Sequence, residues 1–113
     1  MTDQAVIVHF TGYGAQFFKG ADRDLAPLDK LQLELEGTLA VEGTGILDGN
    51  EMAIDGSEGT FYFYGADARA LFESIEDILD ESPITKGGTA TLVFGDPTDE
   101  NAPSEMVKLG YQS

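Results

Sequence analysis

The hydrophobic positions along the chain form two patterns, short β-rich runs and two longer stripes with the spacing of a helix. β-branched and aromatic residues fill the short runs, and glycines flank most of them, so these runs predict strands. The clearest strands are predicted at residues 5–11, 60–65 and 89–95. Weaker strands are predicted at 45–54, which a glycine-containing turn signal interrupts, and at 106–111.

Each of the two apolar stripes predicts one amphipathic helix. The first stripe consists of Leu28, Leu31, Leu35 and Leu39. Pro27 suits the first turn of this helix, where its missing N–H costs nothing, and Gly37 is expected to fray or end the helix early. The second stripe consists of Leu71, Phe72, Ile75, Ile78 and Leu79. Asp67 is the predicted N-cap of the second helix, and Pro83 ends it.

The predicted elements follow the order β-α-β-β-α-β, with one further strand near the C-terminal end. This order is typical of a ferredoxin-like α+β fold, an antiparallel sheet with two helices on one face. Residues 12–24 and 96–105 are expected to be irregular connections, and residues 55–59 a tight turn. No linker or repeat divides the chain, so we expect residues 1–113 to form a single domain.

One face of the predicted sheet has no helix to cover it, yet its residues are not simply polar. If the phenylalanines of 60–65 face the helices, the other face carries Ile7, His9, Tyr62, Tyr64, Thr91 and Val93. Tyrosine suits a surface that is exposed to solvent in the free protein and buried in a complex. The pattern therefore predicts a dimer or partner interface on this face. The alternative is an ordinary β surface, because tyrosine and threonine are good strand formers.

The charge of the chain narrows the classes of partner. Twenty-one acidic residues face six basic ones, for a formal net charge of −15. The negative electrostatic field of such a chain repels nucleic acids and anionic membranes and attracts a basic protein or a cation. High solubility, or adaptation to a salty cytoplasm, is the simpler explanation of the same charge. No cysteine is present, and no apolar run approaches the ~20 residues of a membrane span, so we expect a cytoplasmic protein.

Two further surfaces are candidates for contact with a partner. The first is the glycine-flanked loop, with Tyr13, Phe17, Phe18 and Arg23, because aromatic and arginine side chains are typical interface anchors. The alternative, which we favour, is that its phenylalanines fold over the end of the core. The second surface is an acidic ridge on the second helix, made of Glu73, Glu76, Asp77, Asp80 and Glu81. A solvated acidic face explains this ridge as well as a docking site for a basic partner does.

Catalytic and metal chemistry find little support in the sequence. A weak Ca²⁺ site could draw on Asp48, Asn50, Glu51 and Asp55, but the spacing does not fit an EF-hand, and a bulged strand with a turn explains the glycines there. His9 is the only histidine, and acid–base work with Tyr62 or Tyr64 would lack an oriented nucleophile. We therefore assign no catalytic, cofactor-binding or metal-binding residue, and expect no cofactor.

The central segment, ILDGNEMAIDGSEGTFYFYGADARALF (46–72), is similar to a group of small acidic bacterial proteins. The similarity rests on a D-G-N-E segment and a Y-G-x-D-A-x-x-L-F junction between a strand and a helix. It supports the order of elements and implies no catalytic residue.

The combined interpretation is a non-enzymatic, acidic protein-interaction module of inhibitor, immunity or regulatory type, homodimeric through the uncovered sheet face. The alternative is a small enzyme or ligand-binding domain with a pocket around His9, Tyr62 and Tyr64. Neither nucleic acid nor a membrane is an expected partner, whereas a basic protein is compatible with the charge.

Overall fold

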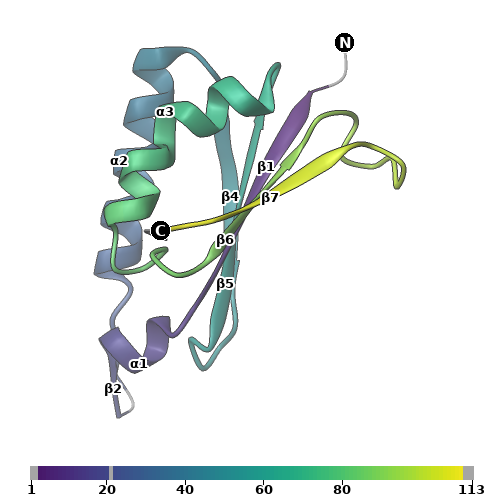
Figure 1. The fold of residues 1–113 in the computed structure, drawn as a ribbon. Coiled ribbons are helices and arrows are strands. Elements are labelled where there is room, and N and C mark those ends of the chain that lie inside the picture. Colours follow the sequence, from purple (N-terminus) through teal and green to yellow (C-terminus); the bar gives the residue numbers. More distant parts are fainter. Residues whose placement is uncertain (1–2, 21, 111–113) are drawn as a thin grey trace.

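The computed structural model describes residues 3–20 and 22–110, and Figure 1 shows how its helices and strands are arranged. The elements are β1 (Gln4–Thr11), α1 (Tyr13–Phe17), β2 (Phe18–Lys19), β3 (Asp22–Arg23), α2 (Ala26–Glu42), β4 (Ile46–Met52), β5 (Glu58–Gly65), α3 (Ala68–Glu81), β6 (Thr89–Val93) and β7 (Ser104–Lys108). In the described part of the chain, no helix is both long enough and apolar enough to cross a membrane.

Five strands form one antiparallel sheet in the order β4-β5-β1-β6-β7. Helices α2 and α3 pack side by side against the same face of this sheet (Figure 1). Strands β2 and β3 form a separate two-stranded ribbon next to the short helix α1. The predicted α+β class, with an antiparallel sheet and two helices on one face, is therefore confirmed.

The core lies between this sheet face and the two helices. Val6 pairs with Phe63 and Val8 with Phe61 across β1 and β5, and all four side chains are fully buried. The leucines of the first predicted stripe and most of the second stripe cover them from the helical side. Burying one such side chain stabilises the fold by about 1.5–3 kcal/mol, so this alternation determines which sheet face turns inward. The phenylalanines of β5 therefore face the helices, as expected.

The expectation that Gly37 frays or ends the first helix is wrong. Helix α2 continues through Gly37 to Glu42 and ends at Gly43, which adopts the left-handed conformation with φ of 69°. A mid-helix glycine costs about 1 kcal/mol. Leu35 and Leu39 on either side of it are buried in the core, and the free energy of that packing exceeds the cost.

Helix α3 begins and ends where the sequence predicts. The Asp67 side chain accepts hydrogen bonds from the backbone N–H groups of Arg69 and Ala70, so Asp67 is the N-cap. The last helical residue is Glu81, and Pro83 follows two positions later. Pro83 cannot continue the helix, because it lacks the N–H group that a helix interior requires.

The segment 12–24 is more ordered than the irregular connection predicted for it. The Tyr13 side chain is fully buried, and its hydroxyl donates to the Asp24 carbonyl at 2.7 Å. The same hydroxyl accepts a hydrogen bond from the Leu28 N–H at 3.2 Å. These two bonds join α1 to the start of α2, so a hydroxyl group contacting residues 11 and 15 positions away organises the segment.

Two strand boundaries also differ from the predicted ones. The segment predicted to interrupt the strand at 45–54 remains in β4, because a bulge between Leu47 and Gly49 absorbs the irregularity. The last strand is Ser104–Lys108 and begins before the predicted residue 106, since the Phe94 N–H donates to the Pro103 carbonyl at 2.8 Å and closes the β6–β7 hairpin earlier. The predicted end at residue 111 lies outside the described residues.

Gly59 provides a test of the core packing. A methyl group at this position would overlap the ring of Phe10, which is buried against Phe61. We expect Gly59→Ala to lower the free energy of unfolding by about 1–3 kcal/mol, measured by urea denaturation. Gly49→Ala is the matched control, because Gly49 also lies in a strand and has open space at its Cβ position. Equal effects of the two substitutions would contradict the packing.

Candidate functional site

The sheet face away from α2 and α3, here called the open face, is the first candidate surface. Cross-strand pairing arranges its side chains in rows that run across the sheet. The first row is Ile46, Tyr64, Ala5, Val93 and Ser104. The second row is Gly49, Tyr62, Ile7, Thr91 and Met106. The third row is Glu51, Thr60, His9, Thr89 and Lys108.

The six residues that the sequence predicts for this face all lie on it. Ile7, His9, Tyr62, Tyr64, Thr91 and Val93 are each half-buried in the isolated chain. Two apolar residues that the sequence analysis missed join them at the edge strands, Ile46 with 61% and Met106 with 69% of the residue exposed. Both could have been found by extending the alternation of the face to the outer strands. The open face therefore combines a half-buried centre with exposed apolar edges.

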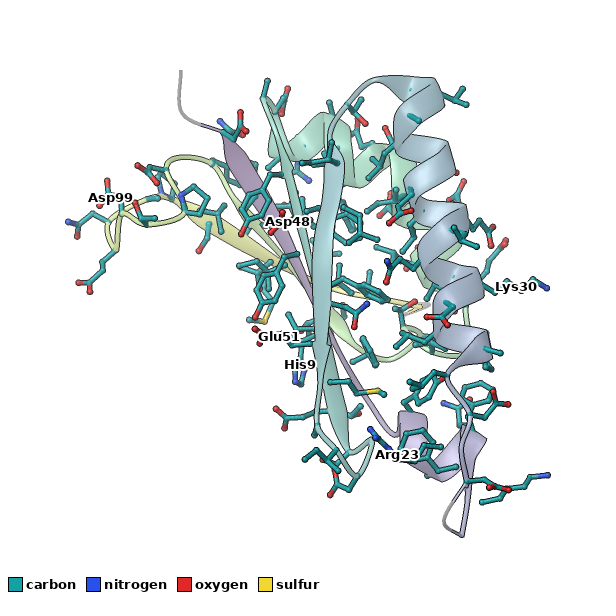
Figure 2. The ribbon with its side chains drawn as sticks, turned by 180° about the vertical axis from the view of Figure 1, so that it is seen from behind. His9, Arg23, Lys30, Asp48, Glu51 and Asp99 are labelled. Atoms are coloured by element: carbon teal, nitrogen blue, oxygen red, sulfur yellow. The ribbon has the colours of Figure 1, made fainter. Side chains whose placement is uncertain are left out.

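The first two rows of the open face contain no charged side chain, although 24% of the residues in the chain are charged. Asp48, in the bulge between Leu47 and Gly49, lies at the edge of these rows without a paired position in them, and Glu51, His9 and Lys108 lie in the third row. Figure 2 shows His9, Glu51 and Asp48 on the side of the sheet opposite α2, with Asp48 at the β4 edge. The open face is thus an uncharged patch with polar and charged groups along part of its border.

Two polar contacts lie at this charged border. The Tyr62 hydroxyl donates to Glu51 Oε2 at 3.3 Å, and His9 Nε2 lies 3.9 Å from Glu58 Oε1. Partial burial raises the pKa of Tyr62, and the nearby Glu51 charge and its hydrogen bond raise this pKa further. Neither contact orients a nucleophile, so the pair lacks the geometry of an acid–base catalyst with a substrate-attacking group.

The residues considered for Ca²⁺ point in different directions. Asn50 Nδ2 donates to Gln32 on α2, whereas Glu51 lies on the open face. The Asp55 carboxylate accepts the Ser57 N–H at 2.9 Å within its own turn. Among the residues that the structure describes, no group of three or more His, Cys, Asp and Glu side chains could hold a metal ion.

The aromatic rings of the glycine-flanked loop cover the end of the core, which is the alternative that the sequence analysis favours. Tyr13 is fully buried and cannot contact a partner, so its assignment to a contact surface is wrong. Phe17 and Phe18 are half-buried against the core. Arg23 is exposed, with its guanidinium carbon 5.3 Å from the Phe18 ring centre. Burial of the aromatic rings is the more stable outcome, since it removes apolar area from water.

The predicted acidic ridge lies along α3. Its three exposed members are Glu73, Asp77 and Glu81, and its half-buried members are Glu76 and Asp80. Asp80 Oδ1 accepts the Gly110 N–H at 2.7 Å, which fixes one of these carboxylates to the chain after β7. Burial raises the pKa of Glu76, and the charges of Asp80, Asp77 and Glu73 raise it further against the opposing effect of Arg69. The carboxylates of the ridge therefore repel one another at neutral pH.

Sequence reasoning missed a groove of about 380 Å³. The segments that line it meet at the lower end of the helical layer in Figure 1. Its lining residues are Phe17, Pro27, Lys30, Leu31, Glu34, Ile78, Glu81, Ser82, Pro83 and Ile84. They come from α1, from the first half of α2, from the last turn of α3 and from the residues after it. The two prolines signal helix boundaries in the sequence, but no pattern indicates that they share a groove.

Comparison with known proteins adds no functional evidence. No family model, curated protein or solved structure matches this chain. The functional argument therefore rests on the geometry and charge of the surfaces described above.

The Tyr62–Glu51 contact predicts a change in tyrosine titration. Glu51→Gln removes one negative charge beside the hydroxyl, so we expect the Tyr62 pKa to fall toward the ordinary tyrosine value. Titration followed by NMR of labelled tyrosine rings measures this shift. Tyr13 is the internal control, because burial first, and then neighbours other than Glu51, set its raised pKa. An unchanged Tyr62 pKa would exclude the contact in solution.

The raised pKa of Glu76 predicts how stability depends on pH. The folded protein binds this proton more tightly than the unfolded chain, so the contribution of Glu76 to stability decreases as pH rises through its folded pKa. We expect Glu76→Gln to raise the free energy of unfolding at pH 7, and this gain to vanish below the ordinary glutamate pKa. Urea denaturation across this pH range measures it, with exposed Glu100→Gln as control. A gain that does not depend on pH would contradict the prediction.

Proposed function

We propose that this protein is a non-enzymatic interaction module that forms a homodimer through its open face and offers its acidic helical surface to a basic partner protein. An inhibitory, immunity or regulatory role is compatible with such a module. The single observation that carries the proposal is that no paired position in the first two rows of the open face holds a charged side chain, since Asp48 lies in the β4 bulge at the edge of the sheet.

Charge supports a second copy of the chain as the occupant of the open face. Two copies with a formal charge of −15 each repel one another, so they can associate only where the surfaces that meet carry few carboxylates. The open face meets this condition over its first two rows, and a homodimer interface is self-complementary by symmetry. Tyr62, Tyr64 and Met106 are residue types that are enriched in interfaces.

We further propose that β1, β4, β5 and β6 form a ferredoxin-like arrangement, to which β7 is added at one edge. Support comes from the connections: α2 links β1 to β4 across β5, and α3 links β5 to β6 across β1. All neighbouring strands in the sheet are antiparallel. The insertion of α1, β2 and β3 ahead of α2 is additional to that arrangement. This topology puts both helices on one side and leaves the open face for a partner.

Thr91→Glu tests the proposed dimer. Thr91 lies in the second row between Ile7 and Met106, so a symmetric dimer would bring two added carboxylates into an uncharged interface. Size-exclusion chromatography with light scattering is expected to give a dimer mass for the unmodified protein and a monomer mass for Thr91→Glu. The weakening is expected to be about tenfold or more in the dissociation constant.

Thr38→Glu is the matched control, because Thr38 is also a half-buried threonine but lies on α2. The control variant is expected to remain dimeric. Circular dichroism establishes that both variants are folded. A monomeric unmodified protein at all concentrations would refute the proposed dimer, and so would equal dissociation of both variants.

A further inference from the structure

The segments that line the groove belong to the helical layer, away from the open face, and contacts within the chain hold one wall of the groove in place. Gln16 Nε2 donates to the Pro83 carbonyl at 3.0 Å, which joins α1 to the residues after α3. The rings of Phe17 and Tyr13 pack with centres 4.8 Å apart, and Tyr13 is fully buried. One wall of the groove therefore does not have to form on binding, and a preformed site loses less entropy when it is occupied.

The lining of the groove is mainly apolar. Leu31 and Ile84 are buried, Ile78 is half-buried, and Pro27 and Pro83 lie at the boundaries of α2 and α3. A volume of about 380 Å³ is near the lower end of the range for ligand pockets. A groove of this size and composition accommodates one or two large apolar side chains better than it accommodates a folded surface.

Each of the two helices that line this groove contributes a carboxylate. Glu34 belongs to α2 and Glu81 to α3, and neither takes part in the ion pairs found within residues 3–20 and 22–110. Lys30 is the one cation among the lining residues. The last turn of α3 carries no basic side chain, so the partial negative charge of the helix end is not neutralised there. A cationic ligand is therefore favoured next to Glu81.

We infer that this groove binds a basic amphipathic segment of a partner protein, which inserts an apolar side chain between Leu31 and Ile78 and pairs its lysine or arginine side chains with Glu34 and Glu81. The inference rests on the basic partner of the proposed function and names the site where that partner binds. It does not require the open face to form a dimer.

Two observations favour a basic segment over a second copy of this chain. The groove adjoins the acidic ridge, which continues from Glu81 through Asp80 and Asp77 along α3. A second copy would bring its own excess of acids, 21 against six bases, to this already acidic surface. An amphipathic helix in an apolar groove is a common mode of peptide recognition, and added basic residues supply the complementary charge.

The test uses a panel of helical peptides, each with one Leu, Ile, Phe or Trp anchor on a lysine-rich face. A matched panel replaces the anchor by Ser, and another replaces the lysines by Glu. Fluorescence anisotropy measures the affinity of each peptide for the full chain. We expect peptides with both the anchor and the lysines to bind, and loss of either feature to weaken binding by about tenfold or more.

Charge-reversal variants locate the site. The combined change Glu34→Lys and Glu81→Lys is expected to weaken binding of the best peptide by about tenfold or more. The control combines Glu36→Lys and Glu100→Lys, which changes the net charge equally at exposed positions outside the groove. This control is expected to weaken binding by about threefold or less, through the long-range field alone.

Methyl NMR on isoleucine-labelled protein separates the groove from the open face. Bound peptide is expected to shift the methyl signals of Ile78 and Ile84, which line the groove, and to leave those of Ile7 and Ile46 on the open face unchanged. Shifts confined to Ile7 and Ile46 would overturn the groove site and leave the basic partner of the proposed function in place.

Three other outcomes would overturn the inference. If peptides without an apolar anchor bind as tightly as peptides with one, then charge alone recruits them. No measurable binding by any peptide would exclude the basic segment as the occupant. A change of oligomeric mass in the Glu34→Lys and Glu81→Lys variant would identify a second copy of the chain as the occupant.

Discussion

The burial of β1, β5 and β6 against α2 and α3 is the contact on which the rest of the structure depends. It fixes which face of each strand turns inward, because a shift of one residue would move Val6, Val8 and Phe61 to the solvent side. Two helices cannot also cover the reverse face of a five-stranded sheet. The same packing that stabilises the core therefore leaves Tyr62 and Ile7 on an uncovered surface.

The sequence predicts this division well, because it depends on local periodicity. The alternation in β5 separates Phe61 from Tyr62, and the stripe on α3 needs only spacings of three and four residues. The N-cap at Asp67 is predictable for the same reason, since its partners lie two and three positions ahead. Gly37 misleads the prediction, because helix propensity is a weaker effect than the burial of the leucines around it.

The remaining features depend on contacts between residues far apart in the chain. The Tyr13 hydroxyl joins the loop to α2 by hydrogen bonds, and no sequence pattern encodes those partners. The groove requires Phe17, Pro27 and Pro83 to converge from three segments, and each of these residues has a simpler local explanation. Prediction from sequence therefore succeeds for the five-stranded sheet, for α2 and α3 and for the residues of the open face. It fails for α1, β2 and β3 and for the groove, which exists only once the helices have packed.

The two surfaces differ in charge, and the proposed function gives them different partners. The paired positions in two rows of the open face carry no charge, so a second copy of this acidic chain can approach that face. The groove, in contrast, lies beside Glu81 and the acidic ridge. Because α2 and α3 lie on the opposite side of the sheet, a dimer joined through the open face would hold its two grooves on its outer surfaces. Two basic segments in one partner could then bind together, and the effective concentration of the second would raise the overall affinity without any new contact. In this arrangement the uncharged face determines the valency and the acidic helical layer determines the specificity.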